Sequence, residues 1–371
     1  MGVFRFCLAL SVAAFHLSAM GEHVAMVAVF CFYAISGYLI TRILCETYTA
    51  PVQGVAGFAL NRFLRLYPTY WTVALVGVGL ALFLPAQTAH LHPGIAIPDT
   101  PGGGLANLFI LGLANFAIEP RNEPIRLVPT AWSLSIELVY YALLALGIAR
   151  RRLAVLVWWT ASLALAVWLI ARGDLRTAYF SLWGPSLCFA TGALMHHLDA
   201  PGRARRLLAA FPAARALPFL ALAAVCAGPY ALGWAALPAL SLPTLYLAPL
   251  VAALAIALLT EDREARVPES PAARWDRRIG DLSYPIFLSH WHVGVLVSAG
   301  LLGGAGQGPW LFAASLPFIL LAAVLLVAGV EGPVRRLRGT VRRWSHGRGA
   351  PGRAPGGGLP HRASVSGGAP P

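Results

Sequence analysis

The sequence contains no lysine, few charged residues of either sign and only five cysteines. Charged residues make up 12% of the 371 residues, and the mean hydropathy is +0.68, whereas soluble domains carry roughly 25% charged residues. These values exclude an ordinary soluble domain and indicate an integral membrane protein. The cysteines lie in or beside apolar segments without paired spacing, so we expect neither a disulfide framework nor a metal site.

All 28 basic residues are arginines, which gives the chain a net charge of +13. Together with abundant alanine, glycine and proline, this usage suggests a GC-rich bacterial genome. A strongly basic chain can bind nucleic acid. The positions of the arginines therefore decide between a nucleic-acid partner and a membrane topology signal.

Ten segments are apolar enough and long enough to cross a bilayer. They are 3–20, 24–41, 66–84, 132–149, 153–171, 179–195, 216–233, 240–259, 282–301 and 310–330. Runs of this length satisfy their backbone groups in lipid by forming helices. We therefore predict an all-α integral membrane fold with about ten transmembrane helices.

The arginines are concentrated in alternate connections between these segments. If the amino terminus is cytoplasmic, 24 of the 28 arginines fall on the inner side, in agreement with the positive-inside rule. The pattern predicts that both termini are cytoplasmic, that the chain resides in a lipid bilayer and that it binds no nucleic acid. The apolar amino terminus could pass for a signal peptide, but a second apolar run from Val24 favours a helical hairpin.

Two parts of the chain are not predicted to span. The connection 85–131 is rich in proline and glycine, and its apolar run 105–116 is too short to cross, which favours a re-entrant or interfacial helix. Residues 336–371 are basic and rich in glycine and proline, so we expect a disordered cytoplasmic tail. Residues 1–335 then form one polytopic membrane domain.

The stretch "RFCLALSVAAFH" places Arg5 and His16 eleven positions apart in an apolar segment. Eleven residues bring a helix round to within about 20° of its starting direction and rise about 16 Å, so both side chains share one face. With Arg5 at the membrane surface, His16 is expected near the middle of a hydrocarbon layer about 30 Å thick. A polar ring at that depth favours a function. The alternative is a histidine hydrogen-bonded inside the bundle.

The stretch "NRFLRLYPTYW" places Arg62 and Arg65 three positions apart, on one face of a helix. Two guanidinium groups at this spacing can clamp phosphates from the cytoplasmic side. The alternative is a positively charged flank beside an interfacial belt of Tyr67, Tyr70 and Trp71.

The stretch "TAWSLSIELVYY" puts Trp132 at the predicted outer interface and Glu137 more than a helical turn further in. A carboxylate at that depth needs a partner or a water-filled cavity. It either belongs to a functional site or forms a structural ion pair with an arginine.

Two further stretches carry small or titratable residues. In "GDLSYPIFLSHWHV", Asp281 or Ser283 can cap a helix that contains His290, and His292 points to another side of that helix, which argues against a shared metal site. In "FYAISGYLITRIL", Ser36 and the glycine after it are expected to allow close helix packing.

Taken in this order, the motifs resemble those of acyltransferase family 3 membrane proteins. The spacing of Arg5 and His16, the arginine pair in "RFLRLYP", and the blocks "ISGYLITR", "WSLSIE" and "LSYPIFLSHW" are similar to the family's motifs. The resemblance runs from about Arg5 to Arg335. Members move acyl groups, commonly acetyl, from acyl-CoA to extracytoplasmic or lipid-linked glycans and related hydroxylated acceptors.

The resemblance implies a role for several residues. His16 is expected to be catalytic with Arg5 in support, and Arg62 and Arg65 are expected to engage the acyl-CoA donor. We expect Glu137 to orient His16 or to bind the acceptor. Acceptor-binding or structural roles are left open for Trp132, Ser133, Ser283, Tyr284 and His290.

The resulting hypothesis is a multi-pass O-acyltransferase of the bacterial inner membrane. Its partners are acyl-CoA as a donor substrate and a glycan or lipid-linked saccharide as acceptor, with no tightly bound cofactor and no metal. The alternative is a transporter or flippase of a glycan intermediate, with His16 as a proton relay. Transporters often carry inverted repeats, and the absence of matching halves in this sequence favours the enzyme.

Overall fold

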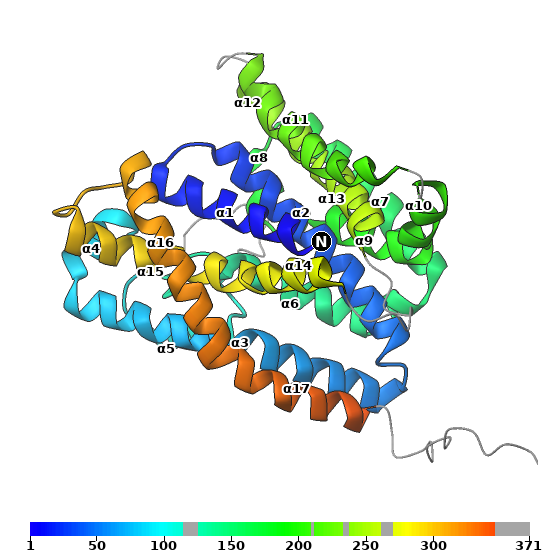
Figure 1. Ribbon diagram of the computed structural model, residues 1–371, viewed down its shortest axis with the longest axis horizontal. Helices are drawn as coiled ribbons and strands as arrows, with labels where there is room; N and C mark the ends of the chain where they lie inside the picture. Colours follow the sequence, from blue (N-terminus) through cyan, green and yellow to red (C-terminus); the bar gives the residue numbers. More distant parts are fainter. Residues whose placement is uncertain (114–124, 209–210, 233–236, 261–269, 346–371) are drawn as a thin grey trace, which may run out of the picture.

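The computed structural model describes residues 1–113, 125–208, 211–232, 237–260 and 270–345 (Figure 1). Within these ranges the chain is helical throughout most of its length and has no β-strand. Its α-helices are α1 (Gly2–Ser18), α2 (Glu22–Glu46), α3 (Pro51–Phe83), α4 (Pro85–Leu91), α5 (Pro101–Phe109), α6 (Ala131–Ala145), α7 (Arg152–Arg172), α8 (Leu175–Phe180), α9 (Ser186–His197), α10 (Ala200–Leu208), α11 (Leu217–Ala231), α12 (Leu237–Leu245), α13 (Ala248–Leu259), α14 (Pro271–Asp281), α15 (Ser283–Leu301), α16 (Pro309–Leu326) and α17 (Gly332–Ser345). Shorter turns are η1 (Ile148–Arg150), η2 (Pro212–Ala216) and the π-helical η4 (Val327–Glu331).

Six helical stretches in the described part of the chain are long and apolar enough to cross a membrane. They are Glu22–Glu46, Val52–Phe83, Arg152–Arg172, Pro212–Ala231, Leu240–Leu259 and Pro309–Ser345. The apolar helices α1 and α6 are shorter, with 17 and 15 residues. The all-α prediction is confirmed, and the protein is a multi-pass membrane protein.

The helices that carry the predicted site residues pack against one another. α1 packs against α2, α14 and α15, and α3 packs against α15 and α17. In Figure 1, α3 and α17 run side by side along one edge of the molecule, and α1, α14 and α15 lie beside one another in its middle. Residues from the two ends of the sequence therefore meet in one region.

Small residues allow the tightest of these packings. A Cβ atom added at Gly37 on α2 would overlap the backbone of Phe189 on α9, and one at Gly192 on α9 would overlap the backbone of Ala34. The expectation that the "ISG" block serves close packing is confirmed for Gly37, because the two backbones approach without side chains between them.

Gly192→Val is expected to disrupt the packing of α2 on α9. The added side chain meets backbone atoms that cannot move aside, so the cost lies at or above the upper end of the about 1–3 kcal/mol typical of overpacking. Thermal unfolding and size-exclusion profiles in mild detergent measure the effect. Gly79→Val is the matched control, because no atom lies within 4 Å of a Cβ at Gly79. Equal stability of the two variants would contradict this account.

The start of α1 is held by a carboxylate from α14. Asp276 Oδ2 accepts a hydrogen bond from Gly2 N at 2.7 Å, and Oδ1 accepts one from Val3 N at 2.9 Å. Burial raises the pKa of this carboxyl, but the two amide hydrogen bonds and the amino group of Met1 together outweigh burial and leave the pKa below its ordinary value. The carboxylate thus acts as a cap supplied by another helix.

Two helix ends differ from the predictions. In the expected interfacial run 105–116, α5 ends at Phe109 and Ile110 adopts a φ of 66°, while residues 114–124 lie outside the described ranges. Neither Asp281 nor Ser283 caps α15, whose N-cap residue Leu282 makes no side-chain cap bond. Asp281 instead forms an ion pair with Arg335 at 3.1 Å.

The predicted tail 336–371 begins inside a helix. α17 continues to Ser345, because Pro333 suits the first turn and the next residues alternate arginines with apolar side chains such as Val334 and Leu337. The remaining residues of the predicted tail, 346–371, lie outside the described ranges.

Candidate active site

His16 lies in the last turn of α1, with its ring only partly buried. Its Nδ1 atom is 2.8 Å from Nε2 of His290 on α15, and its ring stacks on Trp291 with centroids 5.3 Å apart. His290 is fully buried. The sequence predicted that each of these histidines sits in a helix, and the structure brings the two together.

The hydrogen bonds of His290 fix which nitrogen of His16 is available for chemistry. Nδ1 of His290 lies 3.0 Å from the carbonyl oxygen of Ile286, which can only accept, so this nitrogen carries a hydrogen. For two neutral rings, Nε2 of His290 then accepts the hydrogen on Nδ1 of His16. The remaining lone pair of His16 is on Nε2, for which no hydrogen bond is present among the described residues.

His16 lies close to the end of α1. The helix ends two residues later at Ser18, Ala19 adopts a left-handed conformation, and the side chain of Gln307 donates to His16 O at 2.7 Å. His92, at the end of α4, lies edge-on to Trp291. The ring therefore sits at the end of a helix beside the 302–308 turn.

The predicted donor arginines lie on α3, and Arg65 faces the carboxyl-terminal helices. Arg65 forms a 2.5 Å ion pair with Glu331 of η4 and stands over the ring of Tyr284, 5.2 Å from its centroid. The hydroxyl of Tyr284 donates to Leu66 O at 2.8 Å. Tyr284 is thus anchored to α3 by its hydroxyl and contacts Arg65 through its ring.

Arg62 lies one turn before Arg65. Its Nε atom is buried and has no hydrogen-bond partner among the described residues, and its guanidinium lies 5.8 Å from the ring centroid of Phe58. Its charge interacts with those of Arg65 and Glu137. A buried guanidinium nitrogen without a partner is costly, so this group is suited to an anionic ligand.

Glu137 is held by two hydroxyl groups. Ser36 on α2 donates to Oε1 at 2.9 Å, and Tyr141, one turn further along α6, donates to Oε2 at 2.7 Å. The charges of Arg62 and Arg5 act on this carboxylate. The expectation that Glu137 orients His16 is wrong, because the ring is held by His290. Glu137 lies within electrostatic reach of Arg62 and Arg5.

The remaining predicted residues make local contacts. Trp132 packs against Tyr179 and Phe180, with centroids 5.2 Å and 5.0 Å away. Ser133 donates to Thr130 O at 2.9 Å, and the buried hydroxyl of Ser283 has no hydrogen-bond partner among the described residues. His292 is bonded through Nε2 to Leu127 O, away from His290, as its position two residues later predicted.

The comparison with known families agrees with this arrangement of residues. The family model described as an acyltransferase domain (Acyl_transf_3) matches residues 1–328. The chain belongs to acyltransferase family 3. No curated protein and no solved structure gives a significant match. The match covers Arg5, His16, Arg62, Arg65, Glu137 and His290, and it establishes the chain as a membrane acyltransferase.

Several residues around this family 3 site were missed by the sequence analysis. They are His92, Tyr141, Glu331 and Arg338, and Ser36, which was assigned only to helix packing, donates to Glu137. Tyr141 could have been found, because it lies four residues after Glu137 on one helix face. No local signal marks Glu331, whose partner Arg65 is far away in the sequence. Within the described residues, no group of three histidine, cysteine, aspartate or glutamate side chains is placed to hold a metal ion.

Proposed function

We propose that this acyltransferase moves an acetyl group from acetyl-CoA to a hydroxyl of a glycan or lipid-linked saccharide on the far side of the bacterial inner membrane. The observation that carries the proposal is the free Nε2 of His16, on a partly exposed ring whose Nδ1 is held by His290. A neutral imidazole in this state can accept a proton from an alcohol.

The proposed topology has ten membrane crossings with both termini in the cytoplasm. The arginine distribution supports this topology. The helices α1, α6, α9 and α15 would supply the four crossings beyond the six long apolar stretches. In this orientation Arg5, Arg62 and Arg65 face the cytoplasm, where CoA esters are made, and His16 faces the opposite side.

The donor fits the distance between these two groups of residues. Eleven residues of helix separate Arg5 from His16, a rise of about 16 Å. An extended pantetheine arm has a comparable length. The phosphates of acetyl-CoA can therefore remain beside the arginines while the thioester reaches His16, so the acyl group crosses the membrane without release of the nucleotide.

The chemical step needs one proton acceptor. Nε2 of His16 takes the proton of the acceptor hydroxyl as its oxygen attacks the thioester carbonyl. The new C–O ester bond forms, the C–S bond breaks, and the CoA thiolate leaves and takes the proton back from His16. The bond from Nδ1 of His16 to His290 keeps the proton-accepting nitrogen free throughout.

The test is transfer of label in a purified system. The protein in detergent is incubated with radiolabelled acetyl-CoA and a glycan-bearing membrane fraction, and base-labile label in the glycan is counted. Label in the glycan, together with salt-sensitive binding of coenzyme A, supports the proposal. Movement of glycan across vesicles without labelling would instead identify a flippase and overturn it.

His290 is expected to act as a positioning residue in this reaction. His290→Leu removes the acceptor for Nδ1 of His16, so the catalytic ring can adopt the other tautomer, and kcat should fall about 10- to 100-fold with little change in KM. His290→Gln should retain more activity, because its amide oxygen can accept the same hydrogen bond. Equal losses in both variants, or a change in KM alone, would contradict this role.

A further inference from the structure

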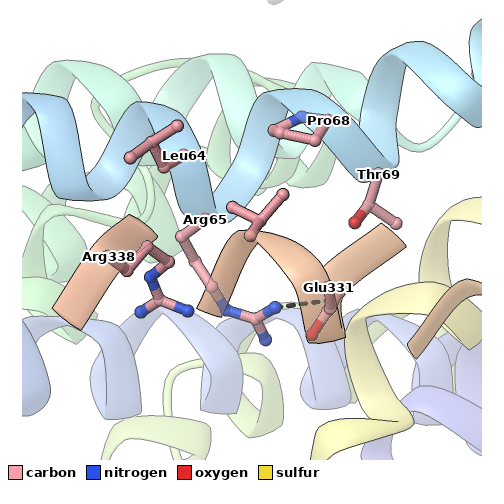
Figure 2. Close-up of a pocket in the computed structure, with 7 residues that line it drawn as sticks. Leu64, Arg65, Pro68, Thr69, Glu331 and Arg338 are labelled. Carbon is pink, nitrogen blue, oxygen red and sulfur yellow. Dashed lines mark ion pairs between the residues drawn. The ribbon is translucent and has the colours of Figure 1, made fainter. Parts of the chain in front are cut away.

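Arg338 on α17 lies beside the donor arginines, although the sequence comparison does not include it. The family match ends at residue 328, whereas Glu331 and Arg338 come after it. A small hollow between α3 and the η4–α17 segment is lined by Leu64, Arg65, Pro68, Thr69, Glu331 and Arg338. Figure 2 shows the guanidinium groups of Arg65 and Arg338 side by side and pointing the same way.

Reciprocal bonds to α3 fix the position of Arg338. Asn61 Nδ2 donates to Arg338 O at 3.1 Å, and Arg338 Nε donates to Asn61 Oδ1 at 3.1 Å. On α3, Asn61 comes four residues before Arg65. Their partners come in the opposite order, since Glu331, the partner of Arg65, precedes Arg338, the partner of Asn61. The two helices are therefore antiparallel here, and Arg338 is one turn of α3 further toward the cytoplasm than Arg65.

The bond to Asn61 uses only the Nε of Arg338. Its two terminal nitrogens form no hydrogen bond and no ion pair among the described residues. A planar guanidinium with its outer edge free can bind a phosphate group through two parallel hydrogen bonds.

The charges around Arg338 leave a positive surplus. Four arginines interact electrostatically in this region, namely Arg5, Arg62, Arg65 and Arg338. Of the carboxylates in reach, Glu331 is paired with Arg65, Asp281 is ion-paired with Arg335, and Glu137 lies with Arg62 and Arg5. Neighbouring like charges repel, so an anionic ligand at Arg338 would relieve an existing cost.

We propose that Arg338 binds the 3′-phosphate of the adenosine end of the acyl-CoA donor, and so makes the enzyme select CoA over its 3′-dephospho form. This inference rests on the proposed function, because it assumes a CoA donor. Along the donor, the 3′-phosphate lies beyond the diphosphate as seen from the thioester. Along the protein, Arg338 lies beyond Arg65 as seen from His16, so the order of the two matches.

The test compares the binding of coenzyme A and 3′-dephospho-coenzyme A by isothermal titration calorimetry in detergent. The unaltered protein should bind coenzyme A about 10- to 100-fold more tightly. Arg338→Gln should weaken coenzyme A binding to the level of the dephospho form, and leave binding of the dephospho form unchanged. Arg338→Lys keeps the positive charge, so its affinity for coenzyme A should lie between those of the unaltered protein and Arg338→Gln. Arg336→Gln is the matched control, an exposed arginine on the same helix, and should behave as the unaltered protein.

The outcomes separate this inference from the proposed function. Equal weakening of both nucleotides in Arg338→Gln, or no weakening of either, would overturn the role of Arg338 while CoA remains the donor. Binding of neither nucleotide by the unaltered protein would overturn the CoA donor itself, and the role of Arg338 with it. Thermal unfolding of each variant shows that the comparison is made on folded protein.

Discussion

His16→Ala is expected to lower the rate of acyl transfer by about 10²- to 10⁴-fold while leaving the binding of coenzyme A unchanged. In the proposed mechanism, the variant loses the nitrogen that accepts the proton of the acceptor hydroxyl. It keeps the arginines of α3, which are proposed to bind the other end of the donor. The measurement is label transfer from acetyl-CoA at saturating donor, together with a binding isotherm for coenzyme A.

The control for this variant is a histidine outside the site. His196→Ala on α9 removes a ring of the same size, whose neighbours are Glu46 and His197. This variant should transfer acetyl groups at the normal rate. Undiminished transfer by His16→Ala would remove the ring from the mechanism. Loss of coenzyme A binding in the same variant would mean that the residue supports the donor site and not the chemistry.

The spacings within single helices were predictable from the sequence because the helical period fixes them. Arg5 and His16 fall on α1 and Arg62 and Arg65 on α3, as expected. The partner of His16 was not predictable, because His290 lies 274 positions away and its neighbours give no sign of which helix it faces. Pairings between helices depend on packing, which hydropathy alone does not encode.

Helix ends were the second feature that the sequence did not reveal. Hydropathy continues past His16, yet α1 ends at Ser18 with Ala19 in a left-handed conformation, a position that glycine usually marks. The exact end of this helix was therefore not predictable. Glu137 was placed in the correct helix. Its hydrogen-bond partner Ser36 was not predictable, because Ser36 lies 101 positions away on α2.

Arg65→Met is expected to destabilise the protein by about 3–5 kcal/mol and also to weaken the binding of the acyl-CoA donor. The side chain of Glu331 is only 6% exposed and its 2.5 Å partner is Arg65, so the variant leaves a buried carboxylate without its cation. Thermal unfolding in detergent measures the loss. Arg335→Met is the matched control, since its ion pair with Asp281 is at the surface and should contribute less than about 1 kcal/mol.

The double variant Arg65→Met/Glu331→Leu separates structure from donor binding. Replacing both members of a buried ion pair with apolar side chains is often neutral for stability, so the double variant should unfold near the temperature of the unaltered protein. Its binding of coenzyme A should remain weaker than that of the unaltered protein, because the guanidinium proposed to bind the phosphates is gone. If coenzyme A binding returned together with stability, Arg65 would serve only to neutralise Glu331, and the donor phosphates would rest on Arg62 and Arg338 alone.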